Sequence, residues 1–370
     1  MKEFILQHYN DYPKSEIQDF FKFLHQSEFG PGHLIADKSE NFKRLQSEFE
    51  NLDKAVKEPV IDILQPHLCR LHLQVLNQTT LAMTTLQRFF EISAMHLQGD
   101  VEIYFKKIDL LKKMCANGDL PFAISEVDIF KTRIELTPTK PFRHSNAYRE
   151  TYAPAYRVVD KKFFDFLDLF AAIDGLMATA IDGDCANAQN ATEDHFKPIV
   201  VAIDGDCASG KTTLSGLLTK VYDCNIIHID HFFLRPEQRT EERLAMPGGN
   251  IDHERFSAEV LDKLKNDAPF SYRPFNCMTQ DFDAPIPLSP QKLTIVEGSY
   301  SQHPELVHHY DLKVFLTVPE DVQLERILKR NGEVMYEKFK NLWIPMEKKY
   351  AETFDIQGNS DLVFDYLSSE

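Results

Sequence analysis

One stretch of sequence decides the fold: Ile199-Val200-Val201-Ala202-Ile203-Asp204-Gly205-Asp206-Cys207-Ala208-Ser209-Gly210-Lys211-Thr212-Thr213. An apolar, β-branched run leads directly into a segment that fits the pattern G-x-x-x-x-G-K-[ST], and a helix-compatible segment follows. The order strand, loop, helix is the context that this phosphate-binding motif requires. A chance glycine-rich turn is the alternative, and the eight-residue match in the right frame argues against it.

The residue types of this loop indicate which ligand it binds. Its glycines allow consecutive backbone N–H groups to turn inward toward a phosphate, and the dipole of the following helix attracts the same negative charge. We expect Lys211 to contact the β- and γ-phosphates of ATP and the Thr212 hydroxyl to bind Mg²⁺. The predicted nucleotide-binding residues are Gly205, Asp206, Cys207, Ala208, Ser209, Gly210, Lys211, Thr212 and Thr213.

The sequence after Pro198 alternates short apolar runs with helical segments. Such runs, rich in β-branched residues and separated by helices, are typical of a parallel sheet that is covered on both faces. We therefore predict an α/β domain over residues 198–370, with a five-stranded parallel sheet flanked by helices. The predicted strands are 199–203, 226–229, 293–296, 314–318 and 362–364.

The first half of the chain has a different pattern. From Pro13 to about Gly118 apolar residues recur at helical spacing, and another helix is predicted over 160–177. Residues 137–156, rich in Pro, Arg and Tyr, are predicted to form a loop. The sequence thus predicts a mainly α-helical domain over 1–181 and a polar linker over 182–197, before the phosphate-binding domain.

Composition excludes several classes of protein. The 370 residues are 43% hydrophobic and 26% charged, which is typical of a globular chain, and the net charge of −16 argues against nucleic acid or anionic membranes as partners. The six cysteines are scattered, and neither a signal peptide nor an apolar run long enough to span a bilayer is evident. We expect a soluble, cytoplasmic protein that binds small molecules, and the composition is compatible with a homo-oligomer.

Four further landmarks follow the phosphate loop in order. The second predicted strand ends in Asp230 before aromatic residues, the segment 250–256 contains Asp252-His253, the third strand ends in Glu297-Gly298, and the basic segment 326–332 follows the fourth strand. In this order, from Lys197 onward, the sequence resembles the uridine kinase and phosphoribulokinase-like family of P-loop kinases. The resemblance implies an ATP-dependent, Mg²⁺-dependent transfer of phosphate to a hydroxyl group.

Each landmark also has a chemical interpretation. Asp230 follows a strand at the carboxyl edge of the sheet, where open α/β folds place ligands, so it is our candidate for the base that orients the acceptor hydroxyl. Helix capping is the alternative for Asp230. Glu297 would be costly if buried without a partner, and we expect Mg²⁺ to be that partner, held also by Thr212 and Asp230. Lys211 completes the predicted catalytic group.

The basic segment supplies two more candidates. Arg326 and Arg330 lie four residues apart and hence on one helix face, where they could neutralise charge on the transferring phosphoryl group. A basic helix face is more often merely solvated. The resemblance favours a catalytic role for both arginines.

The predicted acceptor site departs from the uridine kinase pattern. Residues 271–278 keep Tyr272, but Cys277 stands where the resemblance expects a histidine that reads the base. We therefore predict an acceptor other than uridine, and Arg273 indicates a negatively charged one unless it is simply exposed. Asp252 and His253 are further candidates for acceptor binding.

No family is recognised in the first half, but residues 143–157 concentrate three arginines, a histidine and three tyrosines. Arg143 and Arg149 could complete an acceptor pocket, because guanidinium groups bind phosphate and carboxylate. An interdomain brace would use the same residue types.

Two functions follow from these patterns. The first is an ATP-dependent small-molecule kinase, and the alternative is a nucleotide-gated regulatory or binding protein that hydrolyses ATP slowly. Asp230, Glu297 and the two arginines favour transfer, since a switch needs no base to activate an acceptor.

Overall fold

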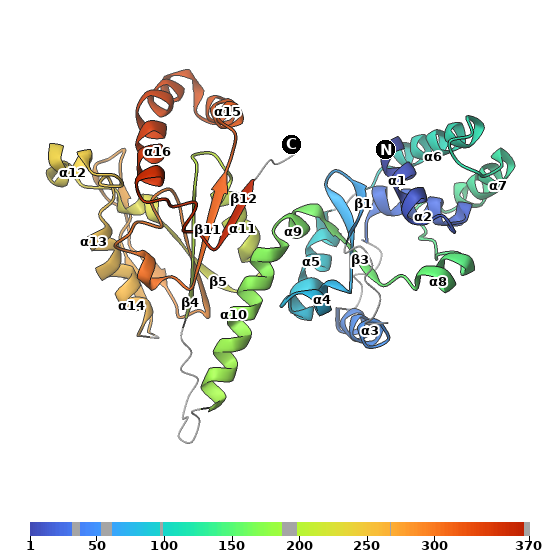
Figure 1. The fold of residues 1–370 in the computed structure, drawn as a ribbon, viewed down its shortest axis with the longest axis horizontal. Coiled ribbons are helices and arrows are strands. Elements are labelled where there is room, and N and C mark those ends of the chain that lie inside the picture. The colour runs from blue at the N-terminus through green and yellow to red at the C-terminus, as the bar shows by residue number, and fades with distance from the viewer. Residues whose placement is uncertain (32–37, 53–60, 97–98, 187–197, 267, 366–370) are drawn as a thin grey trace. The chain divides into compact units, whose positions relative to one another are not determined.

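The computed structural model describes residues 1–31, 38–52, 61–96, 99–186, 198–266 and 268–365 (Figure 1). Contacts divide the chain into two compact units, one ending at Ala171 and the other beginning at Ala172. The division falls within helix α10 (Leu167–Ala186). Of the predicted linker 182–197, residues 187–197 lie outside the described residues. Within the described ranges no helix is long and apolar enough to cross a membrane.

The second unit contains a parallel sheet of five strands, in the order β12-β11-β4-β10-β5. This confirms the predicted α/β fold. The central strand, β4, is buried at every residue, which explains its uninterrupted apolar sequence. The strands are β4 (Ile199–Gly205), β5 (Cys224–His228), β10 (Leu293–Glu297), β11 (Leu312–Thr317) and β12 (Leu362–Asp365).

Helices and two short hairpins complete the second unit. Helix α11 (Lys211–Val221) packs against β4, β5 and β10, and Val200, Val296 and Phe315 of the sheet share a buried cluster with Phe256 and Tyr350. The remaining elements are η2 (Ile229–Phe232), η3 (Pro236–Gln238), α12 (Glu241–Ala245), α13 (His253–Phe256), η4 (Ser257–Leu261), α14 (Asp262–Leu264), the hairpins β6 (Phe270–Tyr272) with β9 (Ile286–Leu288) and β7 (Phe275–Asn276) with β8 (Asp281–Phe282), η5 (Val307–His309), α15 (Glu320–Lys338), η6 (Phe339–Trp343) and α16 (Ile344–Thr353).

The first unit is mainly helical, as predicted, but it also contains an antiparallel sheet in the order β1-β2-β3. The central strand β2 is buried at all five residues although it includes Arg70 and His72, so its sequence lacks the apolar alternation of an ordinary strand. The elements are α1 (Lys2–Asp11), α2 (Ile17–Phe29), α3 (Lys38–Glu50), β1 (Ile61–Gln65), β2 (Leu68–His72), α4 (Val75–Gln78), α5 (Met83–His96), α6 (Val101–Ala116), α7 (Ile124–Glu135), α8 (Asn146–Tyr152), β3 (Tyr156–Asp160) and α9 (Lys161–Asp165).

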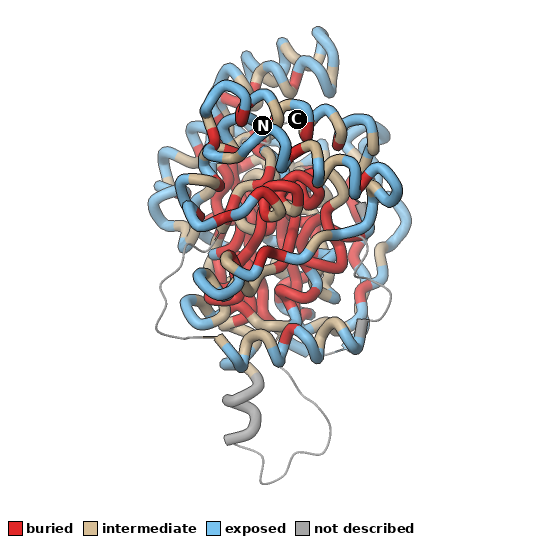
Figure 2. The backbone as a smooth tube through the Cα atoms, turned by 90° about the vertical axis from the view of Figure 1, so that its right-hand side faces the viewer, coloured by how far each residue is buried: buried red, intermediate tan, exposed pale blue. Residues whose placement is uncertain are grey.

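The core of the first unit comes from the helical apolar pattern. Phe20, Tyr104 and Ile108 are fully buried in one cluster, and the described backbone coloured by burial shows such segments inside and exposed ones outside (Figure 2). Two local predictions differ from the structure. The predicted loop 137–156 contains α8, whose first turn is capped by the Ser145 hydroxyl, and the predicted helix 160–177 is broken at Phe166 into α9 and α10.

Candidate nucleotide and phosphoryl-transfer site

The phosphate loop connects β4 to α11 and depends on glycine at both ends. Gly205 and Gly210 have φ angles of 143° and 105°, which L side chains rarely adopt. A Cβ atom at Gly205 would lie 2.1 Å from the backbone oxygen of Leu316 on the neighbouring strand. The Asp206 carboxylate accepts a hydrogen bond from the Val318 amide at 3.1 Å. The loop therefore has the strand, turn and helix context that the motif requires.

Lys211 folds back over this loop. Its ammonium group donates to the backbone oxygens of Gly205 at 2.8 Å and Asp206 at 2.9 Å, and to the Ser299 hydroxyl at 3.3 Å. These neutral acceptors hold the lysine charge at the start of the loop. The cation is thus placed next to the amides that would surround a phosphate.

Glu297 ends β10 and meets two side chains from neighbouring segments. Its carboxylate oxygens lie 3.3 and 3.4 Å from the Thr212 hydroxyl, which donates to them, and His228 Nδ1 contacts the same carboxylate. The contact with Glu297 raises the pKa of His228. His228 is thus a protein partner of this buried acid beside the predicted metal, and its position two residues before Asp230 was the sequence signal available for it.

The pair of Thr212 and Glu297 fits Mg²⁺ by its chemistry. A hydroxyl and a carboxylate oxygen are hard oxygen ligands, and Mg²⁺ in phosphotransfer sites commonly uses one or two such groups together with substrate phosphates and water. No group of three or more His, Cys, Asp or Glu side chains suited to a metal occurs among the described residues. Nucleotide phosphates and water could supply the remaining oxygen ligands.

Asp230 lies in η2, directly after β5. His228 occupies the N-cap position of this turn without a side-chain capping hydrogen bond, and Asp230 lies inside the turn instead of at its cap. Its side chain is accessible to solvent, yet the surrounding protein reduces its hydration and raises its pKa; Lys211 opposes this shift and Glu297 adds to it. Gly298, at φ 131°, leaves room for this turn, since a Cβ there would lie 2.6 Å from Ile229.

Helix α15 places both predicted arginines near the phosphate loop. Arg326 donates to the backbone oxygen of Ala208 at 3.1 Å. Burial raises the pKa of the Cys207 thiol to about 11, and Arg330 opposes this rise through its charge and a hydrogen bond. Arg330 also acts on Asp230, where its charge favours the ionised carboxylate. The two arginines thus bring positive charge to the loop from one helix, before its kink at Gly332.

The predicted acceptor residues have protein partners in this structure. Tyr272 is buried, and its hydroxyl lies 3.0 Å from His231 Nδ1. Arg273 is exposed and donates to the backbone oxygens of Phe282 and Asp283 at 3.1 and 3.2 Å.

Asp252 and His253 stand at the start of α13. Asp252 caps the helix by accepting from the Arg255 amide at 3.1 Å, and it also accepts from Gln238. The His253 ring stacks on His303 with centroids 4.5 Å apart. Acceptor binding by Tyr272, Arg273, Asp252 and His253 stays a prediction, and the structure gives all four of them contacts with other residues as well.

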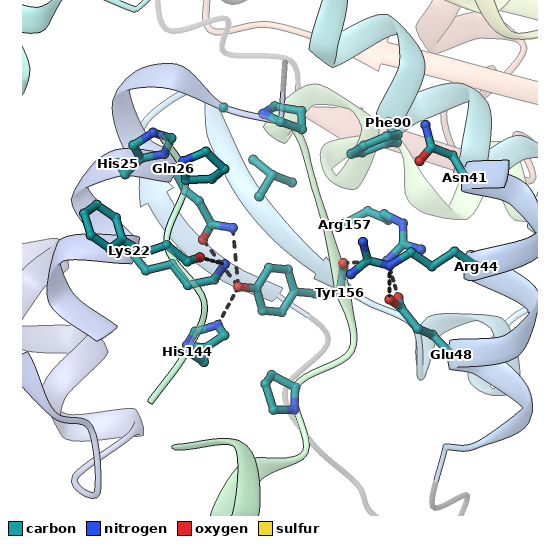
Figure 3. Close-up of a pocket in the computed structure, with 16 residues that line it drawn as sticks. Lys22, His25, Gln26, Asn41, Arg44, Glu48, Phe90, His144, Tyr156 and Arg157 are labelled. Atoms are coloured by element: carbon teal, nitrogen blue, oxygen red, sulfur yellow. Dashed lines mark hydrogen bonds and ion pairs between the residues drawn. The ribbon is translucent and has the colours of Figure 1, made fainter. Parts of the chain in front are cut away.

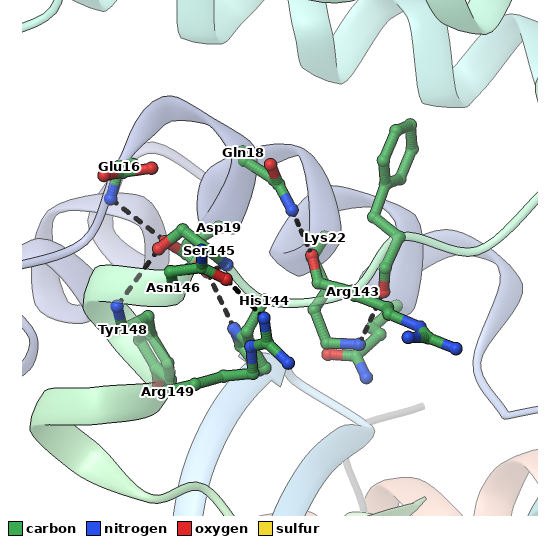
Figure 4. A network of polar contacts seen from close by, with 12 residues as sticks. Glu16, Gln18, Asp19, Lys22, Arg143, His144, Ser145, Asn146, Tyr148 and Arg149 are labelled. Carbon is green, nitrogen blue, oxygen red and sulfur yellow. Dashed lines mark hydrogen bonds and ion pairs between the residues drawn. The ribbon is translucent and has the colours of Figure 1, made fainter.

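Arg143 and Arg149 belong to the first unit. Both side chains are exposed, and Arg149 contacts Asn146 within α8 (Figure 4). Their proposed role in an acceptor pocket also stays a prediction.

Two acidic residues at the phosphate loop were missed by the sequence analysis. Asp204, 2% exposed, accepts from the amides of Gly205 and Gln302 at 2.7 and 3.0 Å and from the Tyr350 hydroxyl at 2.9 Å, which joins β4 to α16. Burial raises the pKa of Asp204. A carboxylate that ends a wholly apolar run was the available signal.

Glu347 reaches the loop from α16. Its carboxylate accepts a hydrogen bond from the Cys207 amide at 3.1 Å, and burial raises its pKa to about 7 although Lys211 and Ser299 oppose the shift. No sequence signal identifies this residue, since 140 positions separate it from Cys207.

Comparison with known proteins finds similarity in structure alone. No family model and no curated protein matches the chain. A possible uridine kinase from Bacillus stearothermophilus is 21% identical, with 51% of this chain and 100% of that chain covered and a TM-score of 0.34. A candidate fructose transport system kinase from Silicibacter sp. TM1040 is 19% identical, with 51% of this chain and 97% of that chain covered and a TM-score of 0.38. D-glycerate 3-kinase from Cryptococcus neoformans is 14% identical, with 46% of this chain and 86% of that chain covered and a TM-score of 0.30. About half of this chain is similar to uridine kinase-like and related P-loop kinases.

Proposed function

We propose that the chain is an ATP-dependent kinase that transfers the γ-phosphate to a hydroxyl group of a small molecule other than uridine. The observation that carries the proposal is the arrangement at the carboxyl ends of three adjacent strands. The loop after β4 provides Lys211 and Thr212, β10 ends in Glu297, and Asp230 follows β5. A cation, a pair of metal ligands and a base are the groups that phosphoryl transfer uses.

Each charged side chain has its own role in binding the nucleotide. ATP would supply the phosphoryl group, and Mg²⁺ would be held by Thr212 and Glu297 and would neutralise the phosphate charge. Lys211 exchanges its contacts with two backbone oxygens for phosphate oxygens, a stronger charge-assisted interaction. Arg326 and Arg330 stabilise charge that spreads over the phosphoryl oxygens in the transition state.

Asp230 orients the acceptor hydroxyl and accepts its proton. A general base works best when its pKa lies near the working pH, and the environment of Asp230 raises its pKa in that direction. The charges of Lys211 and Arg330 oppose this rise and favour the ionised carboxylate. Asp230 is therefore ready to accept a proton while remaining a stronger base than an ordinary aspartate.

The test is a screen of pooled hydroxylated metabolites, uridine included, with the purified chain and Mg-ATP. ADP release and the mass of each pool are measured together. We expect acceptor-dependent ADP release and a phosphorylated product 80 Da heavier, an increment of about one HPO₃ group for a single phosphoryl transfer. ADP release that is independent of any acceptor contradicts the kinase and favours the nucleotide-gated alternative.

A variant connects this activity to the phosphate loop. Lys211→Ala should lower the rate by about 10²–10³ or more, the usual cost of losing one charge-stabilising group. Lys263→Ala, which removes the same charge at an exposed position of α14, is the control and should retain the wild-type rate. Equal rates in the Lys211 variant and the wild type would show that the loop does not carry the activity.

A further inference from the structure

The first unit contains a cavity of about 170 Å³ (Figure 3). Its wall includes three cationic side chains, which are Lys22 of α2, Arg44 of α3 and Arg157 of β3, and one carboxylate, Glu48 of α3. Glu48 accepts from Arg44 at 2.8 Å and from Arg157 at 2.6 Å. Positive charge therefore exceeds negative charge on the wall, and the volume suits a small metabolite better than a nucleotide.

A hydrogen-bonded relay ends at this cavity. Asp19 is fully buried and accepts from His144 Nδ1 at 2.8 Å and from the amide and hydroxyl of Ser145 at 3.0 and 2.6 Å (Figure 4). His144 Nε2 lies 2.6 Å from the hydroxyl of Tyr156, and both of these side chains line the cavity. Asp19 lies in α2, His144 in the segment before α8, and Tyr156 in β3.

The protonation of this relay follows from its surroundings. Burial alone would raise the pKa of Asp19, but hydrogen bonds from His144 and Ser145 outweigh it and leave the pKa below its usual range. Burial lowers the pKa of His144 to about 3, so the ring is neutral. A neutral ring beside a carboxylate donates through Nδ1, and Nε2 then accepts the Tyr156 proton. The Tyr156 oxygen also accepts a long hydrogen bond from Gln26 Nε2 at 3.4 Å, and one lone pair remains for a further donor.

Arg70 lies behind this wall, where its Nη1 pairs with the Asp62 carboxylate at 3.5 Å. It is fully buried, with its guanidinium carbon 4.8 Å from the centre of the Tyr156 ring and its Nε donating to Gln26 at 2.9 Å. Its Nη2 has no hydrogen-bond partner within the described part of the chain. Burial and then the charge of Arg70 lower the pKa of Lys22 to about 8, which leaves Lys22 protonated at pH 7.

We propose that this cavity binds a small organic anion that also carries a hydroxyl group. Lys22 and Arg157 contact the anionic group, and the Tyr156 oxygen accepts the ligand's hydroxyl proton. Lys22 has three N–H donors, of which the Phe142 backbone oxygen takes one at 2.8 Å. This site would be a second ligand site of the chain, built from residues of the first unit and different from those proposed to bind ATP.

The test compares two matched pairs of ligands on the full-length protein without nucleotide. Isothermal titration calorimetry at pH 7 and constant ionic strength measures malate against succinate, which lacks the hydroxyl group, and glycerol 3-phosphate against n-propyl phosphate, which lacks the carbon-bound hydroxyl groups. We expect one hydroxylated anion to bind, about two- to tenfold more tightly than its partner, as one hydrogen bond provides. The pair that binds distinguishes a carboxylate from a phosphate ligand. Dissociation constants above about 10 mM for all four, or equal affinities within each pair, overturn the proposal.

Two variants assign any binding to the cavity. Lys22→Met should weaken binding about tenfold to a hundredfold, because it removes a charge-assisted hydrogen bond, whereas Lys106→Met, at an exposed position of α6, should not. Tyr156→Phe should abolish the preference for the hydroxylated ligand while the hydroxyl-free partner binds as before. Circular dichroism checks that each variant is folded. Wild-type affinity in Lys22→Met, or an unchanged preference in Tyr156→Phe, places the ligand elsewhere.

Discussion

The two charged sites of this chain are assembled in different ways. The nucleotide site is built around one continuous loop, Gly205–Thr212, whose backbone and Lys211 face the proposed phosphate. The cavity of the first unit is lined by residues from separate segments, and a hydrogen bond joins Asp19 to His144 across 125 positions. A site formed by consecutive residues leaves a pattern in the sequence, whereas a site formed by separate segments leaves only its residue types.

Replacement of Asp230, the proposed general base, by asparagine tests the nucleotide site most strongly. Asp230→Asn keeps the shape of the side chain and removes its ability to accept a proton, so kcat should fall by about 10²–10⁴. Binding of Mg-ATP, followed by calorimetry, should persist. Asp223→Asn, an exposed position just before β5, is the control. A variant that unfolds, with a normal rate in its folded fraction, would give Asp230 a structural role instead.

The contrast between consecutive and separate segments explains which features of the second unit the sequence predicted. The strands were evident from apolar runs, most clearly β4 and β10, which are buried at every residue. The edge strands β5 and β12 are less buried, but they keep short apolar runs. Lys211, Thr212, Asp230 and Glu297 were identified because each lies within or directly after a strand or loop pattern. Glu347 was missed because only folding brings α16 to the loop.

The arginines of α15 test whether the site extends beyond the strand ends. Arg330→Met retains most of the apolar stem and removes the charge, so kcat should fall by about 10²–10³ with a smaller effect on the KM for ATP. Lys338→Met, an exposed position on the same helix, is the matched control. A change confined to KM would assign Arg330 to ground-state binding of the nucleotide.

In the first unit the sequence predicted the helices but neither the sheet nor the relay. Helical spacing of apolar residues identified α2, where Phe20 and Leu24 are fully buried. Strand β2 was hidden because the buried Arg70 interrupts its apolar residues. The segment 143–157 was noticed for its composition, but the two arginines chosen there are exposed, and the cavity uses His144, Tyr156 and Arg157 instead.

Replacement of the buried Asp19 carboxylate by an amide tests whether the hydrogen bonds to Asp19 stabilise the first unit. Asp19 accepts hydrogen bonds from two backbone amides, a hydroxyl and an imidazole. In Asp19→Asn one carboxylate oxygen becomes an NH₂ group, which cannot accept a hydrogen bond and would lie against these donors. The free energy of opening should fall by about 2–4 kcal/mol, measured by hydrogen exchange of the α2 and α8 amides. Asp109→Asn, which loses an exposed ion pair with Lys131, should cost less than about 1 kcal/mol. Equal effects would show that the relay contributes no more than a surface ion pair.

The smallest expected effect concerns the carboxylate that approaches the phosphate loop. Burial raises the pKa of Glu347 to about 7, so the group gains its charge as the pH rises through neutrality. Its folded-state pKa lies above the ordinary value, and the folded chain therefore holds a proton that the unfolded chain has released. The contribution of Glu347 to stability falls as the pH rises from about 4.5 to 7.

The same titration should act on nucleotide binding. Ionised Glu347, which accepts from the Cys207 amide, repels phosphate at this loop, so the affinity for Mg-ADP should fall about tenfold between pH 6 and pH 8. Glu347→Gln keeps an acceptor for the Cys207 amide but cannot ionise, and it should flatten this dependence. The nucleotide's own titration is common to both proteins and cancels in the ratio of their dissociation constants at each pH. A ratio that stays constant from pH 6 to pH 8 would mean that Glu347 does not act on the bound phosphate, and that the nucleotide site ends at the groups which the sequence pattern already identifies.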